Sequence, residues 1–192
     1  MKPAPLLFAA SSIVAGLCLS SPAFSQTVMP VERFRSVELR GGGHVILRPG
    51  AAQRVMLLEG STKYTHLHVR NDGQLLIDAC DENCPHDYDL EVEIVTPHID
   101  GVAIEGGGTI ESERGFGRQA SIGAAIQGGG HIDIRSIDAE HADAAVDGGG
   151  HIAVRAESSL EAAVNGGGNV SYWGNPSVTS AVDDGGSVSR GG

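Results

Sequence analysis

The chain has 192 residues, and its 13 Lys and Arg against 24 Asp and Glu give a formal net charge of −11 at pH 7. Nucleic acids and anionic membrane surfaces recruit Lys and Arg, so this acidic balance argues against both as partners. Beyond the first 25 residues no apolar run is long enough to span a bilayer, and the rest of the chain can bury the core of one domain.

The first 25 residues are predicted to be a signal peptide. Lys2 precedes a moderately apolar run over residues 6–19. The tripeptide AFS at 23–25 supplies the small residues that a signal peptidase requires. An uncleaved anchor is the alternative, but a run of about 14 residues is short where roughly 20 are needed. We therefore expect an extracytoplasmic protein (periplasm, cell envelope or secreted), with residues 26–192 forming a single domain.

Residues 35–95 are predicted to form a strand-rich N-terminal cap. Apolar residues alternate with polar ones, and "RPGAAQ" and "RNDGQ" are turn sequences. The predicted strands are Val37–Leu39, His44–Arg48, Arg54–Glu59, His66–Val69, Gln74–Ala79 and Asp89–Val95. Terminal units of repeat proteins are usually atypical because they shield an open end, which is the role expected here.

Cys80 and Cys84 are predicted to form a disulfide bond, because an exported chain meets an oxidising compartment. The bond closes a short loop and should contribute about 2 kcal/mol, as a local staple. A metal site at this pair would need two more ligands. Only His86 and neighbouring acidic residues are near in sequence, and the spacing differs from that of zinc sites.

Residues 96–192 carry a repeat centred on two or three glycines. The copies are VAIEGGGTIES (102–112), AAIQGGGHIDI (124–134), AAVDGGGHIAV (144–154), AAVNGGGNVSY (162–172) and SAVDDGGSVSR (180–190), with a more distant copy, VELRGGGHVIL, at 37–47. Successive copies from 102 onward are 18 to 22 residues apart. A repeat of about 20 residues indicates a solenoid, in which each unit packs only on its neighbours.

Within each copy, apolar residues alternate on both sides of the glycines, which is the pattern of β-strands. The predicted fold is all-β: a right-handed parallel β-helix, or β-solenoid, with glycine-rich corners behind the N-terminal cap. Corners favour glycine because it adopts positive φ freely and lets stacked backbones approach closely. We expect Gly149→Val to destabilise the protein for both reasons. A phosphate-binding loop is disfavoured because strands, not helices, follow the glycines.

An alanine stands three residues before the glycine corner in all five regular copies. These residues are Ala103, Ala125, Ala145, Ala163 and Ala181. By alternation they should point outward and form a smooth strip. Tight packing beside the corners, or cover by another segment, is the favoured interpretation, and a flat docking surface is the alternative.

Glycine corners at this spacing, behind a signal peptide and a strand-rich start, resemble the auto-transporter adhesin head GIN domain family of bacterial envelope proteins. The resemblance covers roughly residues 33–190 and depends on the repeat pattern. It implies a β-solenoid and an extracytoplasmic location. It brings no catalytic residues with it.

A metal site is one alternative function. His131 and His151 follow the glycines in consecutive copies, and Asp147 precedes them, so two imidazoles and a carboxylate could hold zinc or copper. An exposed polar ladder is the simpler interpretation. A calcium-binding nonapeptide repeat is excluded, because the aspartate at position 133 becomes Ala153 and Ser171 in later copies.

A polysaccharide-active enzyme is the other alternative. Its candidate residues are Asp133, Asp143, Asp147, Arg135 and Arg155, with Tyr172 and Trp173 as the nearest aromatic pair. A solvated acidic face explains the same residues. No nucleophile stands in a recognisable setting, so no catalytic residue and no cofactor is predicted.

The function that the sequence favours is a non-enzymatic, adhesin-like binding module that presents a rigid surface to a protein or glycan. The last copy, from Val178 to Arg190, has no distinct capping segment after it. Open strand edges offer unpaired N–H and C=O groups, so homo-oligomerisation through this edge, or fraying of it, is expected.

Overall fold

The computed structural model describes residues 27–80 and 83–192, and the predicted signal peptide lies outside them. Every regular element in these two segments is a β-strand, which confirms the predicted all-β class. None of the described residues forms a helix long and apolar enough to cross a membrane.

The first eight strands are β1 (Thr27–Met29), β2 (Ser36–Arg40), β3 (His44–Pro49), β4 (Arg54–Glu59), β5 (His66–Val69), β6 (Gln74–Asp78), β7 (Glu91–Thr96) and β8 (Gly101–Gly106). The others are β9 (Thr109–Ser112), β10 (Gln119–Gly128), β11 (His131–Asp133), β12 (Ala139–Gly148), β13 (His151–Asn165), β14 (Asn169–Trp173), β15 (Ser177–Asp183) and β16 (Ser187–Arg190).

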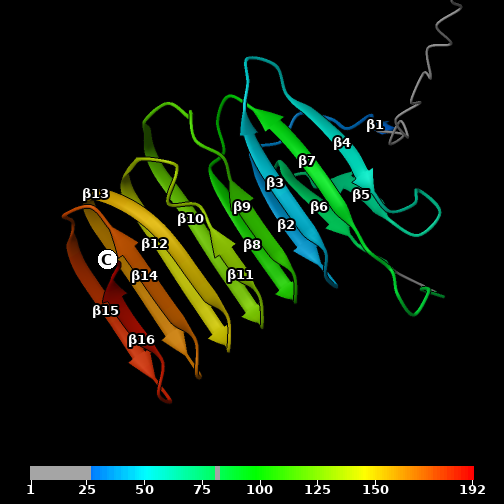
Figure 1. The fold of residues 1–192 in the computed structure, drawn as a ribbon. Coiled ribbons are helices and arrows are strands. Elements are labelled where there is room, and N and C mark those ends of the chain that lie inside the picture. Colours follow the sequence, from blue (N-terminus) through cyan, green and yellow to red (C-terminus); the bar gives the residue numbers. More distant parts are fainter. Residues whose placement is uncertain (1–26, 81–82) are drawn as a thin grey trace, which may run out of the picture.

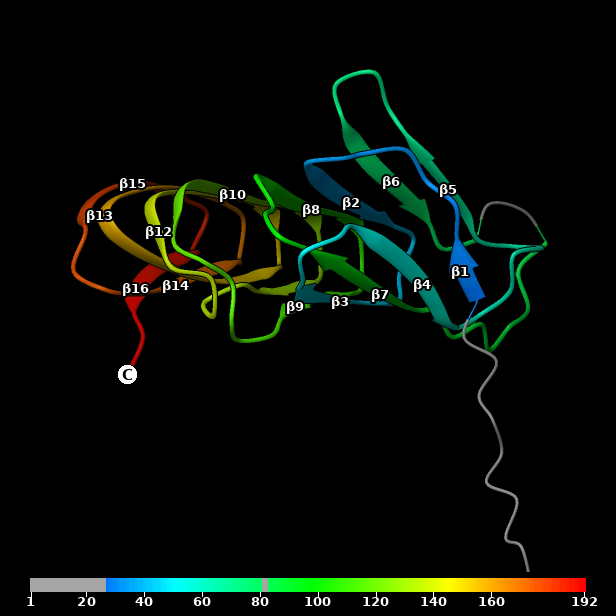
Figure 2. The same ribbon diagram turned by 90° about the horizontal axis from the view of Figure 1, so that it is seen from above.

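These strands form one hydrogen-bonded sheet that folds back on itself as two ladders around a core (Figures 1 and 2). Ladder A runs β1-β4-β7-β3-β9-β11-β13-β14-β16, and ladder B runs β5-β6-β2-β8-β10-β12-β13-β15. The long strand β13 belongs to both: its first part pairs in ladder A and its second part in ladder B. We use the word rung for a unit made of one ladder B strand, the corner after it and the ladder A strand that follows. The pair β10–β11 is an example.

Successive rungs pair in parallel and in register. Ala144 of β12 pairs with Ala124 of β10, and Ile132 of β11 pairs with Ile110 of β9. The same position of the repeat therefore meets the same surroundings in every rung. Inward rows of Ile, Val, Leu and Ala build a continuous core, in which Ile132 and Leu160 are fully buried.

The glycine corners divide into tight and open positions. Gly148 has φ +125°, and a Cβ there would collide with the carbonyl oxygen of Gly128 in the rung before. A Cβ on Gly150 would lie 2.6 Å from the Cγ2 of Ile126. Gly149, between them, has no positive φ and no atom within 4 Å of an added Cβ. The expectation that Gly149→Val is strongly destabilising is therefore wrong, and the steric constraint falls on the first and third glycines.

The strand-rich region of residues 35–95 lies at the N-terminal end of the stack, and part of it is built from parallel rungs. The β2–β3 rung lies between the β6–β7 and β8–β9 rungs and pairs in parallel with both. Among the described strands, the antiparallel pairs are β1–β4, β4–β7 and β5–β6, at the outer end of the stack. Alternation within a strand identified these strands, but it carries no information on which strand lies beside which.

The predicted disulfide bond between Cys80 and Cys84 is present. It lies between β6 and β7, where the other rungs have their corner. The neighbouring corner is close, since a Cβ on Gly41 would lie 3.7 Å from the Cβ of Ala79. The disulfide thus lies at the corner of the outermost parallel rung.

Candidate functional site

The five alanines before the corners form one row on the outer face of ladder B. Parallel pairing joins Ala103 to Ala125, Ala125 to Ala145, and so on to Ala181. Ala103 is half-buried and the other four are exposed. The predicted outward direction is confirmed. The favoured interpretation that another segment covers the row is not confirmed, because no described segment packs over it.

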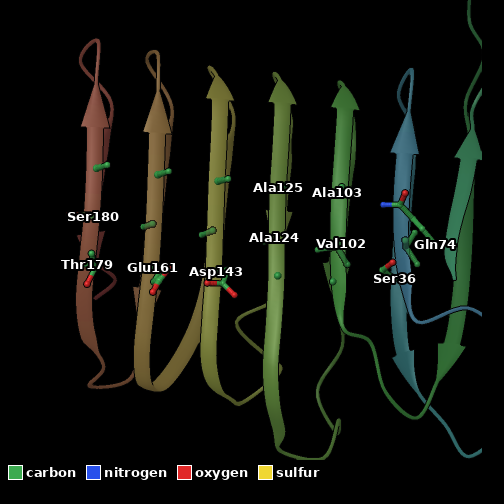
Figure 3. Close-up of a pocket in the computed structure, with 18 residues that line it drawn as sticks. Ser36, Gln74, Val102, Ala103, Ala124, Ala125, Asp143, Glu161, Thr179 and Ser180 are labelled. Carbon is green, nitrogen blue, oxygen red and sulfur yellow. The ribbon is translucent and has the colours of Figure 1, made fainter. Parts of the chain in front are cut away.

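A groove of about 630 Å³ runs along one side of this alanine row (Figure 3). A second hollow of about 600 Å³ runs along its other side, and the two share the row as their floor. Because alanine side chains are short, the backbone of a bound chain could approach the sheet closely. Neither hollow is lined by an aromatic residue.

Carboxylates flank the alanine row on both sides. Asp143 and Glu161 lie along one flank, on neighbouring strands, as Figure 3 shows. Asp147 and Asp183 lie along the other flank, with Asn165 between them donating a hydrogen bond of 3.1 Å to Oδ1 of Asp147. The salt bridges among the described residues include none of these four carboxylates.

No Lys or Arg occurs in the ladder B strands that carry the alanine row, which are β8, β10, β12, the second part of β13, and β15. The negative potential of the flanking carboxylates is therefore not compensated within this face. At the N-terminal end the row meets Glu38, which is paired with Arg40 at 2.5 Å and with Arg70 at 3.4 Å. The ion-paired cluster ends the alanine floor there, and at β15 the floor reaches the open end of the stack.

The predicted metal ligands are only partly brought together. The rings of His131 and His151 stack with centroids 5.2 Å apart and planes 3° apart. Burial, and then the charge of His131, lower the pKa of His151. Asp147 lies across the glycine corner, on ladder B, where it accepts the hydrogen bond from Asn165. Among the described residues no three His, Cys, Asp or Glu side chains form a metal-binding group, so the metal site stays a prediction that lacks a third ligand here.

The structure also separates the residues of the enzymatic alternative. Asp143 and Asp147 lie on ladder B, whereas Asp133 lies on ladder A and pairs with Arg135 at 3.0 Å. Trp173 and Tyr172 point to different sides: the guanidinium of Arg135 lies over the Trp173 ring, and Tyr172 packs against the core. These residues make neither a carboxylate pair nor an aromatic platform.

The geometry defines an all-β protein with two parallel ladders and an acidic groove on one of them. Residues 114–176 match the family described as "Putative auto-transporter adhesin, head GIN domain". This confirms the resemblance that the repeat pattern predicted. No curated protein matches the chain.

The solved structures to which the chain is similar are remote in sequence. A "putative adhesin" from Bacteroides fragilis is 14% identical, with 86% of this chain and 94% of that chain covered and a TM-score of 0.43. A "putative adhesin" from Parabacteroides distasonis is 14% identical, with coverages of 86% and 96% and a TM-score of 0.41. A "putative lipid binding protein" from the same species is 12% identical, with coverages of 88% and 96% and a TM-score of 0.37.

Proposed function

We propose that this chain is an exported, non-enzymatic binding module that holds an extended, basic polypeptide segment along its alanine row. The observation that carries the proposal is the groove itself, an exposed alanine floor flanked by carboxylates without a salt-bridge partner, on strands β8, β10, β12, β13 and β15, whose ladder B parts contain no Lys or Arg. Export follows from the predicted signal peptide. The repeats coil as a right-handed parallel β-solenoid in this proposal, which makes the groove straight and rigid.

The spacing of the flanks suits an extended chain. Asp143 and Asp147 are four residues apart on β12 and point outward on either side of Ala145. At about 3.3 Å per residue their Cα atoms lie roughly 13 Å apart. The side chains of an extended segment alternate between two sides, so Lys or Arg side chains can reach both flanks while the backbone lies on the alanines.

A glycan is the less suitable ligand, because sugar-binding surfaces use aromatic side chains and the groove has none. A polypeptide partner also agrees with the adhesin description of the family. The negative face attracts a basic segment at long range and orients it before contact.

The test is the binding of an eight-residue peptide made of two Lys-Lys-Ala-Ala units, which carries lysines on both sides when it is extended, measured by isothermal titration calorimetry. We expect binding that weakens as salt is added, because exposed charge pairs are screened over about 10 Å at 0.1 M ionic strength. The same peptide with Glu in place of Lys should not bind. Equal binding of both peptides, or no binding of the Lys peptide at low salt, would refute the proposal.

Matched variants distinguish binding in the groove from attraction by the net charge of the protein. Ala145→Leu fills the floor and should weaken binding at least tenfold, whereas Ala51→Leu changes another exposed alanine and should not. The double change Asp143→Asn with Glu161→Gln removes one flank, and Glu111→Gln removes an exposed carboxylate on ladder A as its control. If all variants lower the affinity alike, attraction by net charge explains the binding and the groove does not.

A further inference from the structure

The rung at the C-terminal end, β15–β16, is hydrogen-bonded on one side only within the described part of the chain. β15 pairs with β13, and β16 pairs with β14. Val178 and Val182 occupy inward rows, yet they are 39% and 41% exposed, whereas Leu160 and Val164 beside them in the rung before are 0% and 2% exposed. The end of the stack therefore presents an apolar core and an unpaired strand edge together.

We propose that this edge pairs with a second copy of the chain, with β15 antiparallel to its own copy about a two-fold axis at Ser180. In this register Val178 lies opposite Val182 of the second copy, and Val182 lies opposite Val178. Ser180 faces itself, and Thr179 faces Ala181. The two exposed valines of each copy then cover those of the other and continue the core across the interface.

The sequence of β15 supports a second copy over an unrelated strand. Val178 and Val182 are equally distant from Ser180, so the strand is complementary to itself under a two-fold axis, as an isologous interface requires. Ser180 ends an inward row in which the three preceding residues are Ala124, Ala144 and Ala162. Directly opposite residues of an antiparallel pair have Cβ atoms about 4.5–5.5 Å apart, so the two hydroxyls can hydrogen-bond at the axis.

The charges of β15 and its pairing register both favour a two-fold axis at Ser180. With the axis at Ser180, Asp183 lies opposite Ser177 and no carboxylate of β15 faces another. An axis at Val182 would place Ser180 opposite Asp184 and bring a carboxylate to the end of the core. An axis at Thr179 would pair Val178 with Ser180 and leave Val182 uncovered.

The first experiment is cysteine cross-linking of the full chain in a Cys18→Ser background, so that the introduced cysteine is the only one outside the Cys80–Cys84 disulfide. Ser180→Cys should form an intermolecular disulfide on mild oxidation, because the two residues face each other. Thr179→Cys, its exposed neighbour on the same strand, faces Ala181 and is the matched control. We expect at least a fivefold higher dimer yield for Ser180→Cys, and equal yields would overturn the proposal.

The second experiment measures association by sedimentation equilibrium. The unmodified chain should dimerise, and Val182→Lys should raise the dimer dissociation constant at least tenfold, because it opposes Val178 with a charge. Val28→Lys changes another exposed valine, on β1, and should leave dimerisation unchanged. A chain that remains monomeric at about 0.1 mM, or equal effects of the two lysine variants, would overturn the proposal.

Discussion

Two outward carboxylates near the N-terminal end of the stack differ in their surroundings from two that lie beside the alanine row. In the β2–β3 and β6–β7 rungs, Glu38 and Glu93 are 8% and 7% exposed, and each is paired with arginine. In the later rungs Asp143 and Glu161 are exposed and have no cation beside them. Buried charges require partners, whereas exposed charges can remain free for a ligand. On ladder B, Glu38 is therefore held by arginine, whereas Asp143 and Glu161 have no salt-bridge partner.

The ends also differ in how the stack is closed. Antiparallel strands β1, β4 and β5 cover the outer rung at the N-terminal end (Figure 2). At the other end β15 and β16 leave Val178 and Val182 exposed. Substitutions in the two regions should therefore lower the free energy of unfolding by different amounts.

The largest effect is expected at the tight corner of a repeat. Gly148→Val should lower the free energy of unfolding by more than about 3 kcal/mol, because valine neither adopts a φ of +125° nor avoids the Gly128 carbonyl. Gly149→Val, one residue on, should cost less than about 1 kcal/mol. Urea unfolding measures both, and equal costs would contradict the division of the corner into tight and open positions.

The N-terminal corner provides a comparison at the same position. Gly42 is the middle glycine of its triplet and, like Gly149, has no atom within 4 Å of an added Cβ. Unlike Gly149, it has a φ of +144°. Gly42→Val should therefore cost more than Gly149→Val by about 1 kcal/mol or more, through backbone strain alone.

The next effect concerns the disulfide of the outermost parallel rung. Replacing Cys80 and Cys84 together by serine should lower stability by about 2 kcal/mol, because a short loop gains freedom in the unfolded chain. The strand content measured by circular dichroism should persist at low temperature. Loss of the β-sheet signal under those conditions would show that the disulfide is essential to the fold and not a local staple.

A smaller effect depends on pH and belongs to the repeat region. Burial and the neighbouring His131 lower the pKa of His151, so the folded protein binds that proton less readily than the unfolded chain does. This contribution to stability is fully present above the ordinary pKa of about 6.5 and is lost as the pH falls through the lowered value. Thermal melts from pH 7.5 to 5 should show the loss.

His151→Asn is the matched variant for the pH effect, because Asn169 occupies the same position in the next rung. It should show a weaker dependence on pH over the same range. An unchanged pH dependence would mean that other groups cause it.

The smallest expected effect is a gain in stability at the C-terminal end of the stack. Asp184 has φ +59° at the corner position that glycine fills in the four preceding repeats. Asp184→Gly should raise the free energy of unfolding by about 0.5 kcal/mol, because glycine adopts that conformation without steric cost. Differential scanning calorimetry would measure the gain, and a lower melting temperature would contradict this view of the corner.

Local patterns predicted much of this molecule. Alternation around the glycines located the repeat strands, and the outward direction of Ala145 followed from it. The stacking of His131 on His151 could be expected from the repeat spacing. Asp147 is one corner away from that pair, and the sequence could not show that the corner turns it to the other ladder.

Properties that depend on distant segments could not be predicted. Nothing local to Val37 shows that β2 lies between β6 and β8. Alternation places Ala145 on the outside, but it does not tell whether another segment covers it. The groove became visible only once the course of the whole described chain was known.

The central claim is that the uncompensated acidic face of the repeats is the binding surface, and an NMR titration tests it most directly. The peptide of two Lys-Lys-Ala-Ala units is added to ¹⁵N-labelled protein, and amide shifts are followed. We predict that the largest changes occur at Ala125, Ala145 and Ala163, with little change in β4 and β5 at the N-terminal end. Changes spread evenly over both ends, or centred on ladder A, would contradict the account.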